Sequence, residues 1–135
     1  MASIFTRIID RDIPGYIVAE DEQFIAFLDV RPMAEGHTLC VPKREVDYYY
    51  DLTDEELTGL TLFSKRIARG LKQAVSCRRV ANGVLGLEVP HAHLHLVPIR
   101  QEGDFRFGKV VEVSEERMRQ LRDQITAAID SVDRD

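Results

Sequence analysis

Short runs of β-branched and aromatic residues, separated by turn residues, predict β-strands along much of the chain. These runs lie at 16–20, 24–28, 37–41 and 79–84. Asp21-Glu22, between the first two runs, is a tight acidic turn that makes them a hairpin. Pro42 follows the third run and is expected to end it, because proline has no N–H to give to a sheet. The pattern therefore predicts an antiparallel sheet.

Apolar residues at helical spacing predict three helices, at about 3–10, 54–75 and 114–132. Ser3 is a suitable N-cap for the first helix. Thr53 and Glu56 form a capping-box pattern at the start of the second. The third helix starts at Ser114, and the acidic residues in its first turn complement the helix dipole.

One further run, Pro90–Pro98, alternates histidines with apolar residues. Three of the four histidines of the chain lie in it, at positions 91, 93 and 95. In a β-strand these side chains share one face, and the apolar residues at 92, 94 and 96 share the other. Three imidazoles on one face need three sets of hydrogen-bond partners, so an ordinary core strand is a poor interpretation. This stretch is therefore where function is expected.

Together these elements predict one α+β domain over residues 1–135, built on an antiparallel sheet of about five strands. Its core, which includes the long helix, is expected at about 3–108, and the C-terminal helix at about 114–132 completes the domain. A chain of 135 residues is long enough to bury a core of its own. We find no internal repeat, linker or low-complexity segment.

The charge of the chain limits the classes of partner that it is expected to bind. The net charge is −5 and no block of like charges is present, which argues against nucleic acid or an anionic membrane as a partner. No apolar run has the length of a membrane span, and residues 1–3 lead into a mixed segment rather than a signal peptide. Cys40 and Cys77 are in no metal or redox spacing, so a reducing cytoplasm is the simplest expected location.

The histidine run could carry two kinds of chemistry. Imidazole works near neutral pH as acid, base or nucleophile, and it can attack phosphorus to form a covalent intermediate. The preceding loop, Asn82–Gly86, can bring backbone N–H groups close to a phosphate. Two or three imidazoles on one face also commonly hold zinc, with a further histidine such as His37 completing the shell. The spacing alone leaves covalent catalysis and metal binding equally open.

Several segments together carry a family resemblance. Gly86–Pro98 contains His-x-His-x-His followed by apolar residues, and it resembles the signature of the histidine triad (HIT) superfamily. Ser3–Ile9, Phe24–Pro32 and Glu35–Lys43 resemble the family's earlier blocks, in the right order. The match covers roughly the first hundred residues. It is most similar to the branch of small histidine triad nucleotide-binding proteins.

The resemblance implies a mechanism centred on the middle histidine. His93 would attack the α-phosphorus of a nucleoside phosphoramidate or a related nucleotide, giving a nucleotidyl-histidine that water hydrolyses. His91 and His95 would support it by positioning and by contact with the phosphate. His37 would complete the cluster from a neighbouring strand. From the residues alone, His37 also fits a buried structural histidine.

The resemblance also implies a site for a purine nucleotide of the AMP type. Asp29 would hold the ribose hydroxyls, and Asn82 would lie near the phosphate and sugar. The remaining implied nucleotide-binding residues are Phe5, Ile8, Phe27, Val30 and Glu88. From the residues alone, the four apolar members of that set fit an ordinary core better. Asp29 fits a turn at the end of a strand equally well, and Asn82 also fits a turn before Gly83.

The chain departs from the family pattern at the family's zinc site. Many bacterial relatives carry two cysteines in the first block and a histidine after a Pro-Lys-Lys segment, and these bind a structural zinc with a motif histidine. The corresponding residues here are Ser3, Thr6 and Glu45. We therefore predict no such zinc and no other cofactor.

A second departure lies in the loop before the histidines. Leu87 stands where relatives commonly carry a glutamine that contacts the phosphate. Leucine cannot donate a hydrogen bond, and one neutral hydrogen bond contributes on the order of 1 kcal/mol. The enzyme is therefore expected to be slower, rather than inactive.

These observations predict a phosphoramidase-type nucleotide hydrolase or transferase. A dinucleoside polyphosphate hydrolase is the alternative within that class. A nucleotide- or metal-binding module with little turnover is the alternative outside it. The resemblance further implies a homodimer, with the long helix and the strand near Asn82 at the interface, although the helix pattern fits packing on its own sheet equally well.

Overall fold

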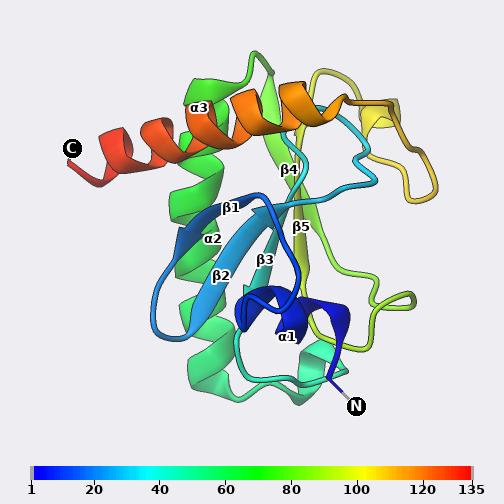
Figure 1. Ribbon diagram of the computed structural model, residues 1–135, viewed down its shortest axis with the longest axis vertical. Coiled ribbons are helices and arrows are strands. Elements are labelled where there is room, and N and C mark those ends of the chain that lie inside the picture. The colour runs from blue at the N-terminus through cyan, green and yellow to red at the C-terminus, as the bar shows by residue number, and fades with distance from the viewer. Residues whose placement is uncertain (1, 135) are drawn as a thin grey trace.

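A computed structural model describes residues 2–134. Five strands form one antiparallel sheet in the order β1-β2-β3-β5-β4 (Figure 1). The strands are β1 Ile17–Glu20, β2 Phe24–Leu28, β3 Thr38–Pro42, β4 Arg79–Gly83 and β5 Leu94–Ile99. The predicted fold class, an antiparallel sheet of about five strands with helices, is confirmed. Pro42 is the last residue of β3, one position beyond the predicted end.

All three predicted helices are present, as α1 Ile4–Ile9, α2 Asp54–Ala74 and α3 Glu115–Asp133. Ser3 and Ser114 cap α1 and α3 through their hydroxyls, and Thr53 with Glu56 forms the predicted capping box on α2. Two short 3₁₀ turns, Tyr49–Asp51 and Glu102–Asp104, were not predicted, because three residues are too few for a periodic pattern.

The helices cover both faces of the sheet. α2 and α3 pack on one face, where Figure 1 shows α3 crossing one end of α2. At this crossing a Cβ on Gly70 would collide with Ile129, so the absence of a side chain permits the close approach. The shorter α1 packs on the other face, with Phe5 against Phe27 and Leu39. The face under α1 is the one on which most of the predicted site residues lie.

The histidine run is only partly a strand, so the prediction of one strand through all three histidines is wrong. β5 begins at Leu94, and His91 and His93 precede it. The backbone N–H groups of His91 and Ala92 bond to the carbonyls of Val89 and Val46, rather than to a neighbouring strand. The alternation of faces still holds, because the apolar residues at 92, 94 and 96 enter the core under α2.

No helix within residues 2–134 combines the length and the apolar character that a membrane crossing requires. The expected cytoplasmic location stays a prediction.

Candidate active site

A cavity of about 300 Å³ opens on the α1 side of the sheet. Its walls come from the start of α1, the loop from the end of β2 to the start of β3, the loop before β5 with the start of β5, and the segment after the second 3₁₀ turn. Seven of the eleven predicted site residues line it: Phe5, Asp29, Val30, His37, Glu88, His93 and His95. The fold therefore gathers residues that are up to 90 positions apart in the chain.

His93 is held in one tautomer by the backbone. Its Nδ1 atom lies 2.7 Å from the carbonyl oxygen of His91. A carbonyl can only accept, so Nδ1 must carry the proton and donate it. Burial lowers the pKa of His93, which keeps the ring neutral near pH 7. The other ring nitrogen, Nε2, therefore carries a free lone pair, as a nucleophile requires.

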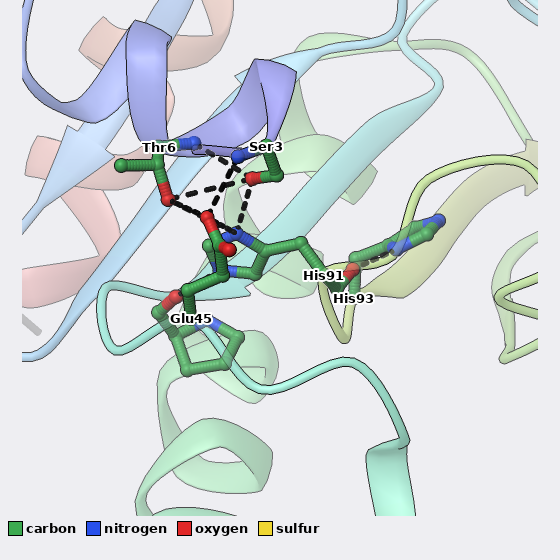
Figure 2. Close-up of polar contacts among 6 residues, drawn as sticks. Ser3, Thr6, Glu45, His91 and His93 are labelled. Atoms are coloured by element: carbon green, nitrogen blue, oxygen red, sulfur yellow. Dashed lines mark hydrogen bonds and ion pairs between the residues drawn. The ribbon is translucent and has the colours of Figure 1, made fainter. Parts of the chain in front are cut away.

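His91 lies behind the cavity rather than on its wall. Its side chain is fully buried, and its Nε2 atom lies 2.7 Å from the carbonyl oxygen of Pro42. Nε2 must therefore donate, and Nδ1 is left to accept a hydrogen bond from the Ser3 hydroxyl at 2.7 Å (Figure 2). His91 thus contributes its backbone carbonyl to His93, while its ring joins the start of α1 to the end of β3.

His37 and His95 form a second fixed pair. The backbone N–H of Met33 donates to Nδ1 of His37 at 2.9 Å, so the neutral His37 ring carries its proton on Nε2. That Nε2 atom lies 2.9 Å from Nδ1 of His95, which must accept. His95 therefore carries its proton on Nε2. This gives the cavity a neutral N–H donor beside the lone pair of His93.

The histidines on the cavity wall share an environment that keeps them uncharged. Burial, and then the nearby His95 and His93, lower the pKa of His37 to about 3. Burial and the nearby His93 lower the pKa of His95 to about 4. The rings of His93 and His95 meet edge to face with centroids 4.9 Å apart. All three residues are therefore neutral at physiological pH, as the tautomer assignments require.

Asp29 lies at the end of β2, where its backbone N–H donates to the His37 carbonyl. One carboxylate oxygen accepts from the Arg31 backbone N–H at 2.9 Å, and the other lies 3.6 Å from Nε2 of His37. Burial raises the pKa of Asp29, against the opposing hydrogen bond from Arg31. The second oxygen remains available to a hydroxyl donor in the cavity.

The other predicted nucleotide-binding residues fall into two groups. Phe5, Val30 and Glu88 line the cavity. Ile8 and Phe27 lie in or against the core under α1, so they support the wall rather than form it. Asn82 lies on β4 opposite Leu96, exposed and outside the cavity lining. Its assignment to the nucleotide site stays a prediction.

Sequence reasoning missed part of the cavity wall. Phe107 packs edge to face on His95 with centroids 5.0 Å apart, and Lys109 lines the cavity beside it. The nearby Phe105 packs against β4 at Gly83. The sequence shows aromatic residues at 105 and 107 in a polar loop, but no local pattern there specifies that one of the rings reaches the histidines. Gly86, in the loop on the facing side, lines the cavity with a φ of 80°, which favours glycine.

The positions of the family's zinc site do not fit zinc in this chain. Ser3 and Thr6 offer neutral hydroxyls, whereas structural zinc takes thiolate, imidazole and carboxylate ligands. Within residues 2–134, the one group of side chains suited to a metal is Asp29, His37 and His95, with ligand atoms within 4.8 Å of one another. Two of those atoms, on the imidazoles, already share a hydrogen bond.

The fold and the cavity define a class of protein: a small α+β domain with an uncharged histidine cluster in which Nε2 of His93 keeps a free lone pair. The family model described as the HIT domain matches residues 10–102, so the chain belongs to the HIT family.

Comparisons with known proteins agree with this assignment. The adenosine 5′-monophosphoramidase HNT1 of Saccharomyces cerevisiae is 39% identical over 102 residues, which are 75% of this chain and 65% of that protein. A hypothetical histidine triad nucleotide-binding protein from Sulfolobus tokodaii superposes with a TM-score of 0.86 at 29% identity, covering 96% of this chain and 93% of the other. A zinc-bound histidine triad family protein from Mycobacterium smegmatis superposes with a TM-score of 0.83 at 28% identity, covering 99% of this chain and 97% of the other.

Proposed function

We propose that this protein hydrolyses purine nucleoside phosphoramidates at the α-phosphorus, with Nε2 of His93 as the nucleophile. The observation that carries the proposal is the 2.7 Å hydrogen bond from Nδ1 of His93 to the His91 carbonyl. It directs the only proton of the neutral ring away from the attacking atom. The similarity to a yeast adenosine 5′-monophosphoramidase supports this choice of substrate.

The proposed reaction has two displacements at phosphorus. First, the lone pair on His93 Nε2 forms a bond to the α-phosphorus, and the P–N bond breaks as the protonated nitrogen of the substrate leaves as an amine. Water then attacks the same phosphorus and the Nε2–P bond breaks. The electron pair returns to the imidazole, and the nucleoside monophosphate leaves. The water proton passes to solvent.

The neighbouring groups suit the charges that this reaction develops. The Nε2–H of His95 is a neutral donor for a phosphoryl oxygen, because Nδ1 of that ring is occupied by His37. Asp29 carries a carboxylate oxygen that no backbone N–H occupies, and a carboxylate is a good acceptor for a ribose diol. Phe5 and Val30 supply apolar surface for a base on the same side of the cavity.

A direct test compares wild type with His93→Ala on adenosine 5′-phosphoramidate. Wild type is expected to release AMP, and His93→Ala is expected to bind AMP with little change but to show no turnover above background. Titration calorimetry with AMP verifies that the variant keeps its nucleotide site. Turnover by His93→Ala at the wild-type rate would overturn the proposal. A dinucleoside polyphosphate assayed in parallel tests the alternative substrate class.

One observation favours a second candidate function, a metal-binding nucleotide module with little turnover. Asp29, His37 and His95 place ligand atoms within 4.8 Å of one another. A metal there would have to displace the hydrogen bond between the two imidazoles. Titration calorimetry with zinc separates the two functions: stoichiometric zinc binding in a protein without phosphoramidase activity favours the module.

We also propose that the chain forms a homodimer through α2 and β4. β4 is at one edge of the sheet and pairs only with β5 within residues 2–134. Leu62 on α2 is 62% exposed, unlike the buried apolar residues on the opposite face of that helix. Analytical ultracentrifugation is expected to give a dimer mass, and Leu62→Glu is expected to shift it towards the monomer. A monomer mass for wild type at micromolar concentration would contradict this proposal.

A further inference from the structure

A hydrogen-bonded cluster joins the start of α1 to the histidine run (Figure 2). One oxygen of the Glu45 carboxylate accepts from the Ser3 backbone N–H at 2.7 Å and from the Thr6 hydroxyl at 2.6 Å. The Ser3 hydroxyl lies 2.7 Å from Nδ1 of His91. Glu45 follows β3, so the cluster ties together three segments that are far apart in the chain.

The direction of each hydrogen bond in the cluster is fixed. The proton of His91 is on Nε2, bonded to the Pro42 carbonyl, so Nδ1 can only accept. The Ser3 hydroxyl must therefore donate to Nδ1, while its oxygen accepts from the Thr6 backbone N–H at 3.0 Å. On the other side of the cluster, the Ser3 backbone N–H and the Thr6 hydroxyl both donate to the Glu45 carboxylate. Each member therefore has a complementary partner, and both nitrogens of the buried His91 ring are hydrogen-bonded.

The position of the His91 backbone directly determines the orientation of the His93 ring. The His91 backbone N–H bonds to the Val89 carbonyl, and the next N–H, on Ala92, bonds to the Val46 carbonyl. The His91 carbonyl between these two fixed amides is the acceptor for Nδ1 of His93. A second route leads through Phe5 on α1, whose ring meets the His93 ring edge to face with centroids 4.9 Å apart.

We propose that Ser3 and Glu45 are positioning residues for the nucleophile, acting through His91 to hold His93 with its proton on Nδ1. This inference rests on the proposed function for its kinetic consequence. The cluster joins the N-terminal helix to the histidine run by hydrogen bonds alone, at the positions where zinc-binding relatives have metal ligands. The nucleophile is then oriented by side chains that never touch the substrate, because none of the cluster residues lines the cavity.

The first test compares Ser3→Ala with Ser114→Ala, because both serines cap a helix through the hydroxyl. Each variant loses an N-cap, but only Ser3→Ala removes the donor to His91. We expect kcat to fall about tenfold in Ser3→Ala with KM within about twofold, and kcat to stay at the wild-type value in Ser114→Ala. Ser3→Thr, which keeps a hydroxyl, is expected to restore most of kcat.

A second pair keeps the test decisive if Ser3→Ala does not fold. Glu45 and Glu20 have similar side-chain exposure, at 35% and 32%, and each carboxylate joins two segments. Glu20 pairs with Arg11 and Lys43 rather than with Ser3 and Thr6. Glu45→Ala is expected to lower kcat as Ser3→Ala does, whereas Glu20→Ala is expected to leave it unchanged. Equal losses of kcat within either pair would overturn the inference.

The tautomer of His93 can be read without any turnover. Long-range ¹H–¹⁵N spectra at neutral pH, assigned by comparison with His93→Ala, distinguish a protonated from an unprotonated ring nitrogen. Wild type is expected to show a protonated Nδ1 and an unprotonated Nε2. Ser3→Ala and Glu45→Ala are expected to move both nitrogens towards intermediate shifts, because the two tautomers then exchange. A purely structural role would lower the melting temperature and leave these shifts unchanged, which would overturn the inference.

The kinetic measurements and the nitrogen shifts together also separate this inference from the proposed function. If wild type has no phosphoramidase activity, the proposed function fails, and the nitrogen shifts still decide whether Ser3 and Glu45 set the tautomer. If wild type is active but the shifts and kcat of both variants match wild type, the positioning role fails and the proposed function stands.

Discussion

Nε2 of His37 lies 2.9 Å from Nδ1 of His95, and this contact determines which nitrogen of His95 faces the cavity as a donor. The orientation starts from the backbone, because the Met33 N–H occupies Nδ1 of His37. The His91–His93 pair is fixed in the same way by the Pro42 and His91 carbonyls. Four neutral histidines thus have one proton arrangement, which places a lone pair on one ring beside an N–H on the next.

Removing His37 is expected to slow the chemistry more than it weakens nucleotide binding. His37→Ala takes away the donor that holds Nδ1 of His95, so the His95 N–H no longer has a fixed direction. We expect kcat to fall by about 10- to 100-fold, which is the loss typical of removing a supporting hydrogen bond from a metal-ligating histidine. Steady-state kinetics measures kcat, and calorimetry with AMP measures affinity. A variant with weakened AMP affinity and unchanged kcat would show that His37 only binds.

The stability of the fold is expected to depend on His37 and His95 as the pH falls. Their pKa values are lowered to about 3 and about 4, below the ordinary value of about 6.5 in an unfolded chain. At pH values between the pKa of the folded state and that of the unfolded state, the unfolded state binds more protons, so acid favours unfolding. The contribution of these two histidines to the free energy of unfolding should therefore be complete above about pH 6.5 and decline towards pH 4.

Urea denaturation at a series of pH values measures this decline. His37→Ala has one such titration fewer, so its free energy of unfolding should fall less steeply than that of wild type. Parallel pH profiles for the two proteins would show that His37 does not titrate with a lowered pKa.

Leu87→Gln is expected to raise kcat. Leu87 lines the cavity and is 84% exposed, so a glutamine fits there without disturbing the core. A new neutral hydrogen bond to the phosphate contributes on the order of 1 kcal/mol, which corresponds to roughly a fivefold gain if it forms in the transition state. Leu85→Gln is the matched control, because Leu85 is on the same loop and half exposed. An equal gain in both variants would indicate a general effect of loop polarity.

Metal removal is expected to leave the protein unchanged. At the family's zinc positions, His91 already has both ring nitrogens bonded, and Ser3 and Thr6 offer only hydroxyls. Dialysis against a chelator should therefore alter neither the melting temperature nor kcat, and elemental analysis should find no stoichiometric zinc. One zinc per chain whose removal lowers the melting temperature would contradict this prediction.

The fold was largely predictable because its local signals agree with its packing. The caps at Ser3, Thr53 and Ser114 and the runs of apolar residues all lie where the structure has helix starts and strands. The start of β5 was not predictable, because His91 and Ala92 bond to loop carbonyls that only the tertiary structure brings near.

The residue types of the site were predictable, but which of these residues line the cavity and which lie behind it was not. The pattern at 91, 93 and 95 indicated one face of histidines, whereas His91 lies behind the cavity and contacts His93 through its backbone carbonyl. Phe27 and Ile8 are apolar residues just as Phe5 is. Only the packing of α1 determines that Phe5 reaches the cavity. Phe107 reaches His95 across a loop whose path no local pattern specifies.

Nε2 of His93 is proposed to form a covalent bond to phosphorus, and trapping that adduct is the decisive experiment. Wild type is mixed with adenosine 5′-phosphoramidate, quenched within milliseconds into alkaline denaturant because the P–N bond is acid-labile, and analysed by intact mass and peptide mapping. We expect a species heavier by one adenylyl group, localised to His93 and absent from His93→Ala. AMP release under single-turnover conditions with no adduct, or an adduct on another residue, would contradict it.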